Sequence, residues 1–488
     1  MSEQTSTTSD QKAQEEQPTA PEGLSGRLVG AALILALGAF VALLDTTVVG
    51  VAMHAFTDSF NAGLAKAQWV STAYLLAMAS IIPVTGWAVK RFGAAKAWIA
   101  SLCVFLVGSA LCGIAWSLGS LISFRVLQGL GAGMLFPLMR IIVVELAGRE
   151  RLGRMMSLIA IPILVAPIVG PIVGGAVVED LSWRWAFYLN VPITIAVIVL
   201  SAIYIPNHRS TAADRLDVAG LVTMSGGLSL VIFGFSKLAE GRSVTDLQVV
   251  SPLVAGLLLL VAHGVRAARS QAAGIVEFGL FRDRSFAASS TVTFLNNFGL
   301  YGAVLLVPLF FQQAGGSGAL SAGLVLAPQG LGMAVAVLVV GRIIDMKSNP
   351  RVVVLLGLLL VAVGTSAFAL NDSGSMNPLL ALALFVHGIG LTCAISPTMV
   401  TLYNSLPTSK VASATTANAI TQQLGGAMGT AVIALLLQHF TQGSSGSVSG
   451  FHTVFWVSVG FVALTAIPAL LLPAGDPKGR KALSASSS

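Results

Sequence analysis

The sequence holds 488 residues, of which 55% are hydrophobic and only 10% are charged. An average soluble domain has about 25% charged residues, so this chain has too few charges to cover a water-exposed surface of its size. Its apolar runs extend over about 20 residues, the length of a membrane-spanning helix and about twice that of a barrel strand. Composition therefore predicts an all-α polytopic membrane protein and excludes a soluble protein and a β-barrel.

The formal net charge of +7 does not indicate nucleic acid binding. The basic residues stand singly or in pairs between apolar runs, which is typical of orientation signals rather than of a phosphate-binding face. The three cysteines form no CxxC or Cys/His cluster, so we expect no metal site. The sequence also has no GxxxxGK[ST] phosphate loop and no nucleophile–base constellation. We therefore expect neither a cofactor nor enzymatic activity.

Hydropathy predicts fourteen membrane-spanning helices. They lie near residues 28–53, 67–89, 96–116, 121–143, 155–178, 183–205, 216–237, 248–268, 286–311, 321–343, 351–371, 378–402, 410–438 and 451–472. Two blocks of six helices, which repeat-built transporters typically have, flank one inserted pair. The predicted units are a disordered tail over 1–27, a six-helix bundle over 28–205, a linker with the two inserted helices over 206–285, a second six-helix bundle over 286–472 and a tail over 473–488.

The distribution of basic residues orients the chain. If the N-terminus is cytoplasmic, 21 of the 27 Lys and Arg residues fall in inner loops and tails, and four fall in outer segments. Positive charge accumulates on the cytoplasmic side of membrane proteins. We therefore predict that both termini are cytoplasmic.

Helix 4 contains the two remaining basic residues, Arg125 and Arg140, and two charged residues within predicted spans are candidates for function. Asp45 interrupts the first apolar helix, and Arg125 lies near the outer end of the fourth. A charge in the bilayer core costs about 2.5–3.5 kcal/mol on insertion scales, so each residue should face a cavity or a partner. The first helix runs outward and the fourth inward, which places both charges in the outer half. Asp45 is thus a candidate proton site with Arg125 as its partner, and the alternative is a purely structural ion pair.

The fifth predicted helix carries small residues at every fourth position. Ala166, Gly170 and Gly174 share one face, Gly175 follows, and Pro167 and Pro171 free backbone carbonyls and bend the helix. Such a face allows close packing against a neighbouring helix. It serves either packing alone or a seal against proton leakage between two moving halves.

A similar loop follows the second helix of each block. The first copy contains Gly86, Lys90, Arg91 and Gly93, and the second contains Gly341 and Asp345. This recurrence supports two related halves.

These features together resemble the major facilitator superfamily, and within it the fourteen-helix drug:proton antiporters. The resemblance covers residues 28–472 and rests on segments of helices 1, 4 and 5, the loop after helix 2 and the start of helix 6. They are Leu44-Asp45-x-Thr47-Val48-Val49, Arg125-x-x-Gln128-Gly129-x-Gly131-x-Gly133, Gly170-Pro171-x-x-Gly174-Gly175, Gly86…Arg91-x-Gly93 and Trp183-Arg184-Trp185-x-Phe187-x-x-Asn190-x-Pro192.

The resemblance implies alternating access, with export of hydrophobic or cationic compounds and import of protons through the cytoplasmic membrane of a bacterium. It assigns proton coupling to Asp45 and Arg125 and an inner gate to the two matching loops. Two departures stand out: Lys90 replaces the usual loop acid, and helix 13 has Gln422 where many relatives have Arg, so an extra cavity cation is expected to be absent. The expected partners are amphipathic substrates, protons and the lipid bilayer, with no nucleic acid and the protein as a monomer. The alternative function is export of one dedicated ligand, such as a lipid, a natural product or an amino acid.

Polar and aromatic residues in the predicted second block are candidates for substrate contact. They are Asn296, Asn297 and Tyr301 in helix 9, His387 in helix 12, and Gln422 and Gln423 in helix 13. The alternative for each residue is a structural role in an interhelical hydrogen bond. His387 is also a second candidate for the proton path, because imidazole titrates near neutrality.

Overall fold

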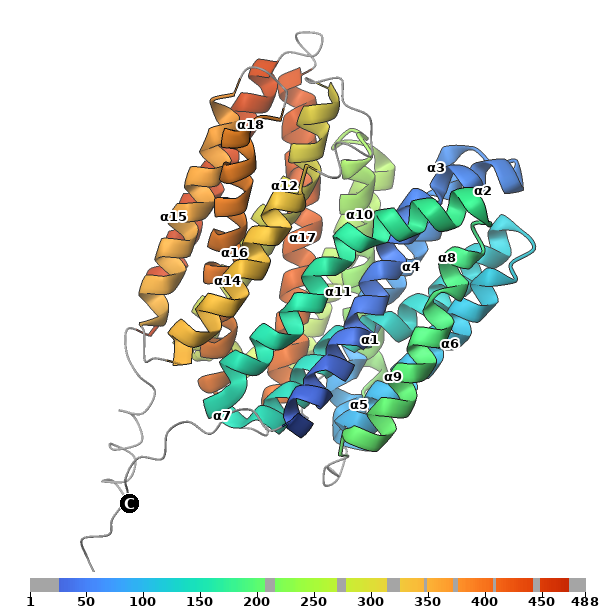
Figure 1. The fold of residues 1–488 in the computed structure, drawn as a ribbon, viewed down its shortest axis with the longest axis horizontal. Coiled ribbons are helices and arrows are strands. Elements are labelled where there is room, and N and C mark those ends of the chain that lie inside the picture. Colours follow the sequence, from blue (N-terminus) through green and yellow to red (C-terminus); the bar gives the residue numbers. More distant parts are fainter. Residues whose placement is uncertain are drawn as a thin grey trace, which may run out of the picture.

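The computed structural model describes residues 26–206, 216–269, 278–313, 325–345, 349–371, 376–406, 410–441 and 448–473. All regular elements in these ranges are helices, as composition predicts. Figure 1 shows them as long, roughly parallel rods in two groups that are inclined to each other.

The helices of the first half are α1 (Gly26–Val51), α2 (Met53–Phe60), α3 (Leu64–Ala67), α4 (Trp69–Ile81), α5 (Val84–Phe92), α6 (Ala94–Gly113), α7 (Leu118–Asp180), α8 (Trp185–Tyr188) and α9 (Asn190–Tyr204). The inserted pair is α10 (Val218–Ala239) and α11 (Leu247–Arg269). The second half comprises η1 (Phe278–Arg282), α12 (Arg284–Gln313), α14 (Ala327–Asp345), α15 (Pro350–Ala369), α16 (Pro378–Asn404), α17 (Val411–Thr441) and α18 (Val448–Leu470).

Local sequence explains where several helices begin and bend. Ser117, Asp217, Asn349 and Asn377 are N-caps whose side chains accept backbone N–H bonds at the starts of α7, α10, α15 and α16. Pro83 stands between α4 and α5, which meet at an angle of 55°. The predicted span 67–89 is therefore one bent pair of helices, because proline cannot continue the hydrogen-bond ladder.

Eleven helices in the described ranges are long and apolar enough to cross a membrane, or twelve if α4 and α5 count as one span. The protein is therefore a multi-pass membrane protein. The prediction of fourteen adds the second part of α7 and the helix near 321–343, where the apolar part of α14 covers only Ala327–Val337. The full count and the cytoplasmic position of both termini stay predictions.

The helix α7 contains 63 residues and reverses its direction. Its residue Arg125 contacts Asp45, and its residue Gly170 packs against Thr47, only two positions further along α1. A straight helix would separate Arg125 from Gly170 by about 67 Å. The two arms of α7 therefore lie along the same part of α1, and they correspond to the predicted helices 4 and 5.

The buried apolar residues show that the two halves meet at one end and are separate at the other. One continuous core joins Val89 of α5 to Val411 of α17. We call this the joined end; it carries Lys90 and is the predicted cytoplasmic end. At the opposite, separated end, the first half has its own core around Phe56 and the second half its own core around Phe310.

The inserted helix α10 contacts both halves near the separated end. The ring of Phe233 lies 5.7 Å from the ring of Trp69 in α4. On the other side, Leu238 shares a small apolar core with Ala431 of α17. After α10 ends, the Gly241 carbonyl accepts a hydrogen bond from Nε2 of Gln438 at 3.3 Å. The pair α10–α11 thus links α4 to α17 where the two main cores are apart.

Candidate functional site

A buried ion pair joins α1 to the first arm of α7. Arg125 NH1 lies 2.5 Å from Asp45 Oδ2, and both side chains are almost completely excluded from the surface. Burying two charges is costly unless they are paired and their remaining hydrogen-bonding positions are filled. The structure thus brings the two intramembrane charges into direct contact, and their role in proton transfer stays a prediction.

Neutral amides complete the shell of the Asp45 carboxylate. Gln128 Nε2 and Asn190 Nδ2 each donate to Asp45 Oδ1 at 2.8 Å. The single oxygen of the Gln128 amide, Oε1, accepts from Arg125 NH1 at 2.7 Å, so Gln128 bridges acid and base. Gln128 Nε2 also lies 2.6 Å from Ser109 Oγ of α6. The carboxylate is therefore held by α7 and α9 together, and α6 supports the bridging amide.

The arginine is held independently of the acid. Arg125 Nε donates to the Val70 carbonyl of α4 at 3.2 Å, and the guanidinium carbon lies 3.8 Å above the centre of the Tyr74 ring. Tyr74 is itself buried and donates its hydroxyl to the Ala42 carbonyl of α1. A cation over an aromatic face gains further stabilisation when water is excluded. Arg125 would therefore keep neighbours in α4 if Asp45 became neutral.

Small residues bring the second arm of α7 against α1 next to this ion pair. A side chain added at Gly170 would overlap Thr47, and one added at Gly174 would lie 3.1 Å from the Val48 Cα. A side chain at Gly175 would meet open space. The predicted small-residue face is thus used at Gly170 and Gly174, directly beyond Asp45 on α1.

A second arginine connects the two halves. Arg140 lies in the first arm of α7, and its NH2 group donates to Gln422 Oε1 of α17 at 3.1 Å. The residues are 282 positions apart in the sequence, and the Arg140 side chain is partly exposed. The resemblance predicts no cavity cation from helix 13, and the structure places a cation from α7 beside Gln422 of α17 instead.

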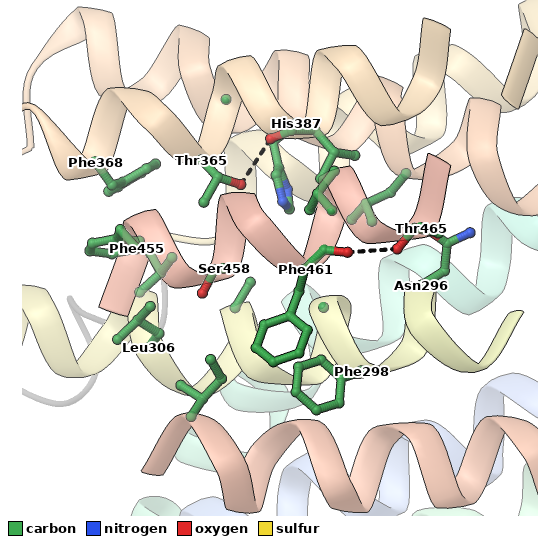
Figure 2. Close-up of a pocket in the computed structure, with 18 of the residues that line it drawn as sticks. Asn296, Phe298, Leu306, Thr365, Phe368, His387, Phe455, Ser458, Phe461 and Thr465 are labelled. Carbon is green, nitrogen blue, oxygen red and sulfur yellow. Dashed lines mark hydrogen bonds between the residues drawn. The ribbon is translucent and has the colours of Figure 1, made fainter. Parts of the chain in front are cut away.

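Two of the predicted substrate residues line a cavity inside the second half. This cavity has a volume of about 40 Å³ and is bordered by Asn296 of α12 and His387 of α16, together with side chains of α15, α17 and α18. Figure 2 shows the His387 ring pointing into the space between these helices and the rings of Phe298 and Phe461 side by side, with centres 4.5 Å apart. His387 and Asn296 are each 5% exposed, and neither His387 Nδ1 nor Asn296 Nδ2 has a hydrogen-bond partner in the described residues.

The other predicted substrate residues have different surroundings. Asn297 donates to the Thr293 carbonyl of its own helix at 2.8 Å. Tyr301 is 49% exposed and lies against Gly426 of α17. Gln423 is partly exposed and adjoins Gln422, which binds Arg140. The structure therefore divides these residues between a cavity inside the second half and the contact between the halves.

Sequence comparison identifies the family. Residues 35–430 match the sequence profile of the Major Facilitator Superfamily, and residues 330–487 match it again. The chain belongs to the Major Facilitator Superfamily. Two relatives are the multidrug resistance protein B homolog of Mycobacterium tuberculosis, 34% identical over 86% of this chain and 78% of that protein, and the multidrug export protein EmrB of Haemophilus influenzae, 31% identical over 83% and 80%.

Solved structures confirm the fold. The human organic anion transporter MFSD10 aligns with a TM-score of 0.63 over 90% of this chain and 100% of its own. The proton:xylose symporter XylE bound to 6-bromo-6-deoxy-D-glucose aligns with the same TM-score over 90% and 94%. Both are 14% identical in sequence, so they support the major facilitator fold alone.

The predicted gate residues of this major facilitator protein lie at the joined end. Gly86 of α5 faces Thr416 and the Ala412 carbonyl of α17. Gly93 has a φ of 86° and ends α5 by donating its N–H to the Val89 carbonyl, a backbone conformation that favours glycine. Lys90 is partly exposed and Arg91 is exposed in the last turn of α5. Gly341 and Asp345 fall in the last turns of α14, and the surroundings of these two residues lie outside the part of the chain that the structure describes.

Sequence reasoning missed three members of the charge network. The sequence indicates no role for Asn190 beyond its place in the family segment, it is equally compatible with Tyr74 facing lipid, and Ser109 of α6 stands in no motif. Small polar residues within apolar helices are common, so their type alone did not select them. Their connection to Asp45 depends on how the five helices α1, α4, α6, α7 and α9 pack, and no local sequence pattern predicts this packing.

Proposed function

We propose that this protein exports hydrophobic or cationic small molecules in exchange for protons, by alternating access, across the cytoplasmic membrane of a bacterium. Two relatives at 31–34% identity carry multidrug names, which supports this substrate class. The observation that carries proton coupling is the Asp45 carboxylate, which is buried, paired with Arg125 and placed where α1, α7 and α9 meet.

In this proposal, proton binding weakens the links between helices. A neutral Asp45 loses its ion pair with Arg125, and a hydrogen bond to a neutral acceptor is weaker than one to a carboxylate. Arg125 keeps its bonds to Val70 and Tyr74, so the arginine stays on α4 while α1 is released. Release of the proton restores the pair. The charge state of one residue would thus set how tightly α1 is held.

The arrangement of the cores supports alternating access. The halves share one core at the joined end and have separate cores at the other. If the joined end is cytoplasmic, this is an outward-facing arrangement, and the opposite state requires separation of Val89 from Val411. Repeat-built transporters alternate in this way about a central substrate site. The proton gradient supplies the energy, so the proposal includes no cofactor, and it treats the monomer as the working unit.

The test uses inside-out vesicles with an imposed pH gradient and a cationic dye. Asp45→Asn resembles the protonated acid but cannot release a proton, so we expect gradient-driven uptake to be abolished while neutral substrates still bind and the cationic dye binds more weakly. Asp45→Glu keeps a titratable group and should retain part of the activity. Uptake by Asp45→Asn at the wild-type rate, with the same dependence on the gradient, would remove Asp45 from the mechanism and leave His387 as the next candidate.

A further inference from the structure

Arg140 is an intramembrane cation whose charge has no counterpart in the described structure. The acid-paired arginine Arg125 lies about 22 Å away along the same helix. The ion pairs among described residues do not include Arg140, and its hydrogen-bond acceptor is the neutral Gln422 amide. A charged residue inside a membrane protein is costly and is normally retained for binding or transport.

The surroundings of Arg140 resemble a binding surface more than a core. The Tyr301 side chain is 49% exposed, although it lies at the contact between α12 and α17. Tyr301 packs against Gly426, which follows Gln422 by about one turn of α17. A cation, a phenol and an amide from α7, α12 and α17 are thus gathered where the two halves meet.

The position of Arg140 also suits a ligand that enters from one side. Arg140 precedes Ala147, the end of the span Leu118–Ala147, by seven residues, which corresponds to about 10 Å. The bond to Gln422 crosses between the halves. Separation of the halves at the joined end would break this bond and leave the cation facing the opening.

We propose that Arg140 forms a recognition site for the carboxylate group of an amphipathic substrate. This inference rests on the proposed export function and specifies its substrate class. Gln422 occupies the guanidinium while the joined end is closed, and a carboxylate replaces Gln422 when that end opens. Guanidinium and carboxylate groups form two parallel hydrogen bonds, which a single amide oxygen cannot match. A substrate carboxylate would therefore stabilise the open state at this end.

A matched pair of dyes tests the site. Rhodamine B and rhodamine B ethyl ester share one cationic chromophore, and only rhodamine B carries a free carboxylate at neutral pH. Binding to purified protein is followed by fluorescence anisotropy for the wild type, Arg140→Gln, Arg140→Lys and Gln422→Ala. We expect Arg140→Gln to weaken rhodamine B binding by about tenfold or more, the range for hydrogen bonds to charged groups, and to change ester binding by about twofold at most.

The control variants separate charge from packing. Arg140→Lys keeps the charge and should retain part of the preference for rhodamine B, and Gln422→Ala should leave rhodamine B binding equal or stronger. Equal loss of both dyes in Arg140→Gln, or no binding of rhodamine B by the wild type, would overturn the inference. Transport is measured separately in vesicles: a wild type that binds rhodamine B but moves neither dye contradicts the export function and leaves the carboxylate site supported.

Discussion

Asn190 donates its amide to the Asp45 carboxylate at 2.8 Å across 145 positions of sequence. This bond makes α9 part of the network that α1 and α7 form, because Asn190 is the first residue of α9. Arg125 and Gln128 both lie on α7, so Asn190 is the residue that couples a third helix, α9, to the protonation state of Asp45. Proton binding at Asp45 would therefore loosen α1 from two neighbours at once.

The first prediction concerns this contact. Asn190→Leu removes one donor from a buried carboxylate and should lower the free energy of unfolding by about 1–3 kcal/mol. We also expect a clear reduction of gradient-driven uptake, measured in inside-out vesicles beside thermal unfolding in detergent. Asn296→Leu is the control for thermal unfolding, since this buried asparagine has no partner for its Nδ2 among the described residues. Equal effects of the two variants would show that Asn190 acts only through its burial.

The second prediction separates two glycines of one motif. Gly170→Ala would overlap Thr47, so we expect α7 to shift from α1, with a loss of about 1–3 kcal/mol and reduced uptake. Gly175→Ala faces open space and should behave as the wild type. The comparison of thermal unfolding and uptake in the two variants checks this. Tolerance of alanine at Gly170 would contradict a tight α1–α7 contact.

The third prediction concerns the start of α10. Partial burial acts to raise the pKa of Asp217, but hydrogen bonds from the Gly220 N–H and Arg266 outweigh it, so this pKa lies below its ordinary value of 3.8. A lowered folded-state pKa means that the carboxylate stabilises the fold above pH 3.8 and ceases to do so as the pH falls through the folded value.

Asp217→Ala removes the helix cap and the bond to Arg266, and we expect a loss of about 1 kcal/mol near pH 7. Amide hydrogen exchange at the first turn of α10 reports this difference directly. The difference between variant and wild type should shrink as the pH is lowered from 5 to 3. A difference that is constant over this range would assign the effect to packing rather than to the carboxylate.

The fourth prediction concerns topology. The distribution of Lys and Arg places both termini in the cytoplasm. Single cysteines at Ser2 and Ser487, in a background without the three native cysteines, should therefore resist a membrane-impermeant thiol reagent in intact cells and react after permeabilisation. Labelling of either position from outside would refute the orientation or the even number of spans.

The sequence predicted the elements better than the contacts between them. Apolar runs define the spans because a helix must satisfy its own backbone in lipid, and that requirement is local. The meeting of Asp45 with Arg125 was also accessible, since helix direction fixes the depth of each charge. The bend at Pro83 follows from the lost N–H, but hydropathy alone indicates only a single span over 67–89 and says nothing of its shape.

The division of the substrate residues was not accessible from sequence. The neighbours Asn296 and Asn297 lie on different sides of α12, and only Asn296 lines the cavity with His387. Polar residues occur on several faces of this helix, so no periodic pattern indicates which face meets the other half. The contact between Arg140 and Gln422 depends on how the two halves are placed relative to each other. The sequence of neither helix indicates which residue of the other half it contacts.

The position of α10 has a consequence for the transport cycle. Phe233 and Lys237 of α10 lie against the Trp69 ring, while Leu238 packs with Ala431 on the opposite half. If the halves rock about the joined end, the distance between α4 and α17 changes, and α10 cannot keep both contacts unaltered. At least one of the two contacts of α10 would then have to rearrange in each transport cycle. The strength of the contact with Trp69 would therefore help to determine the transport rate.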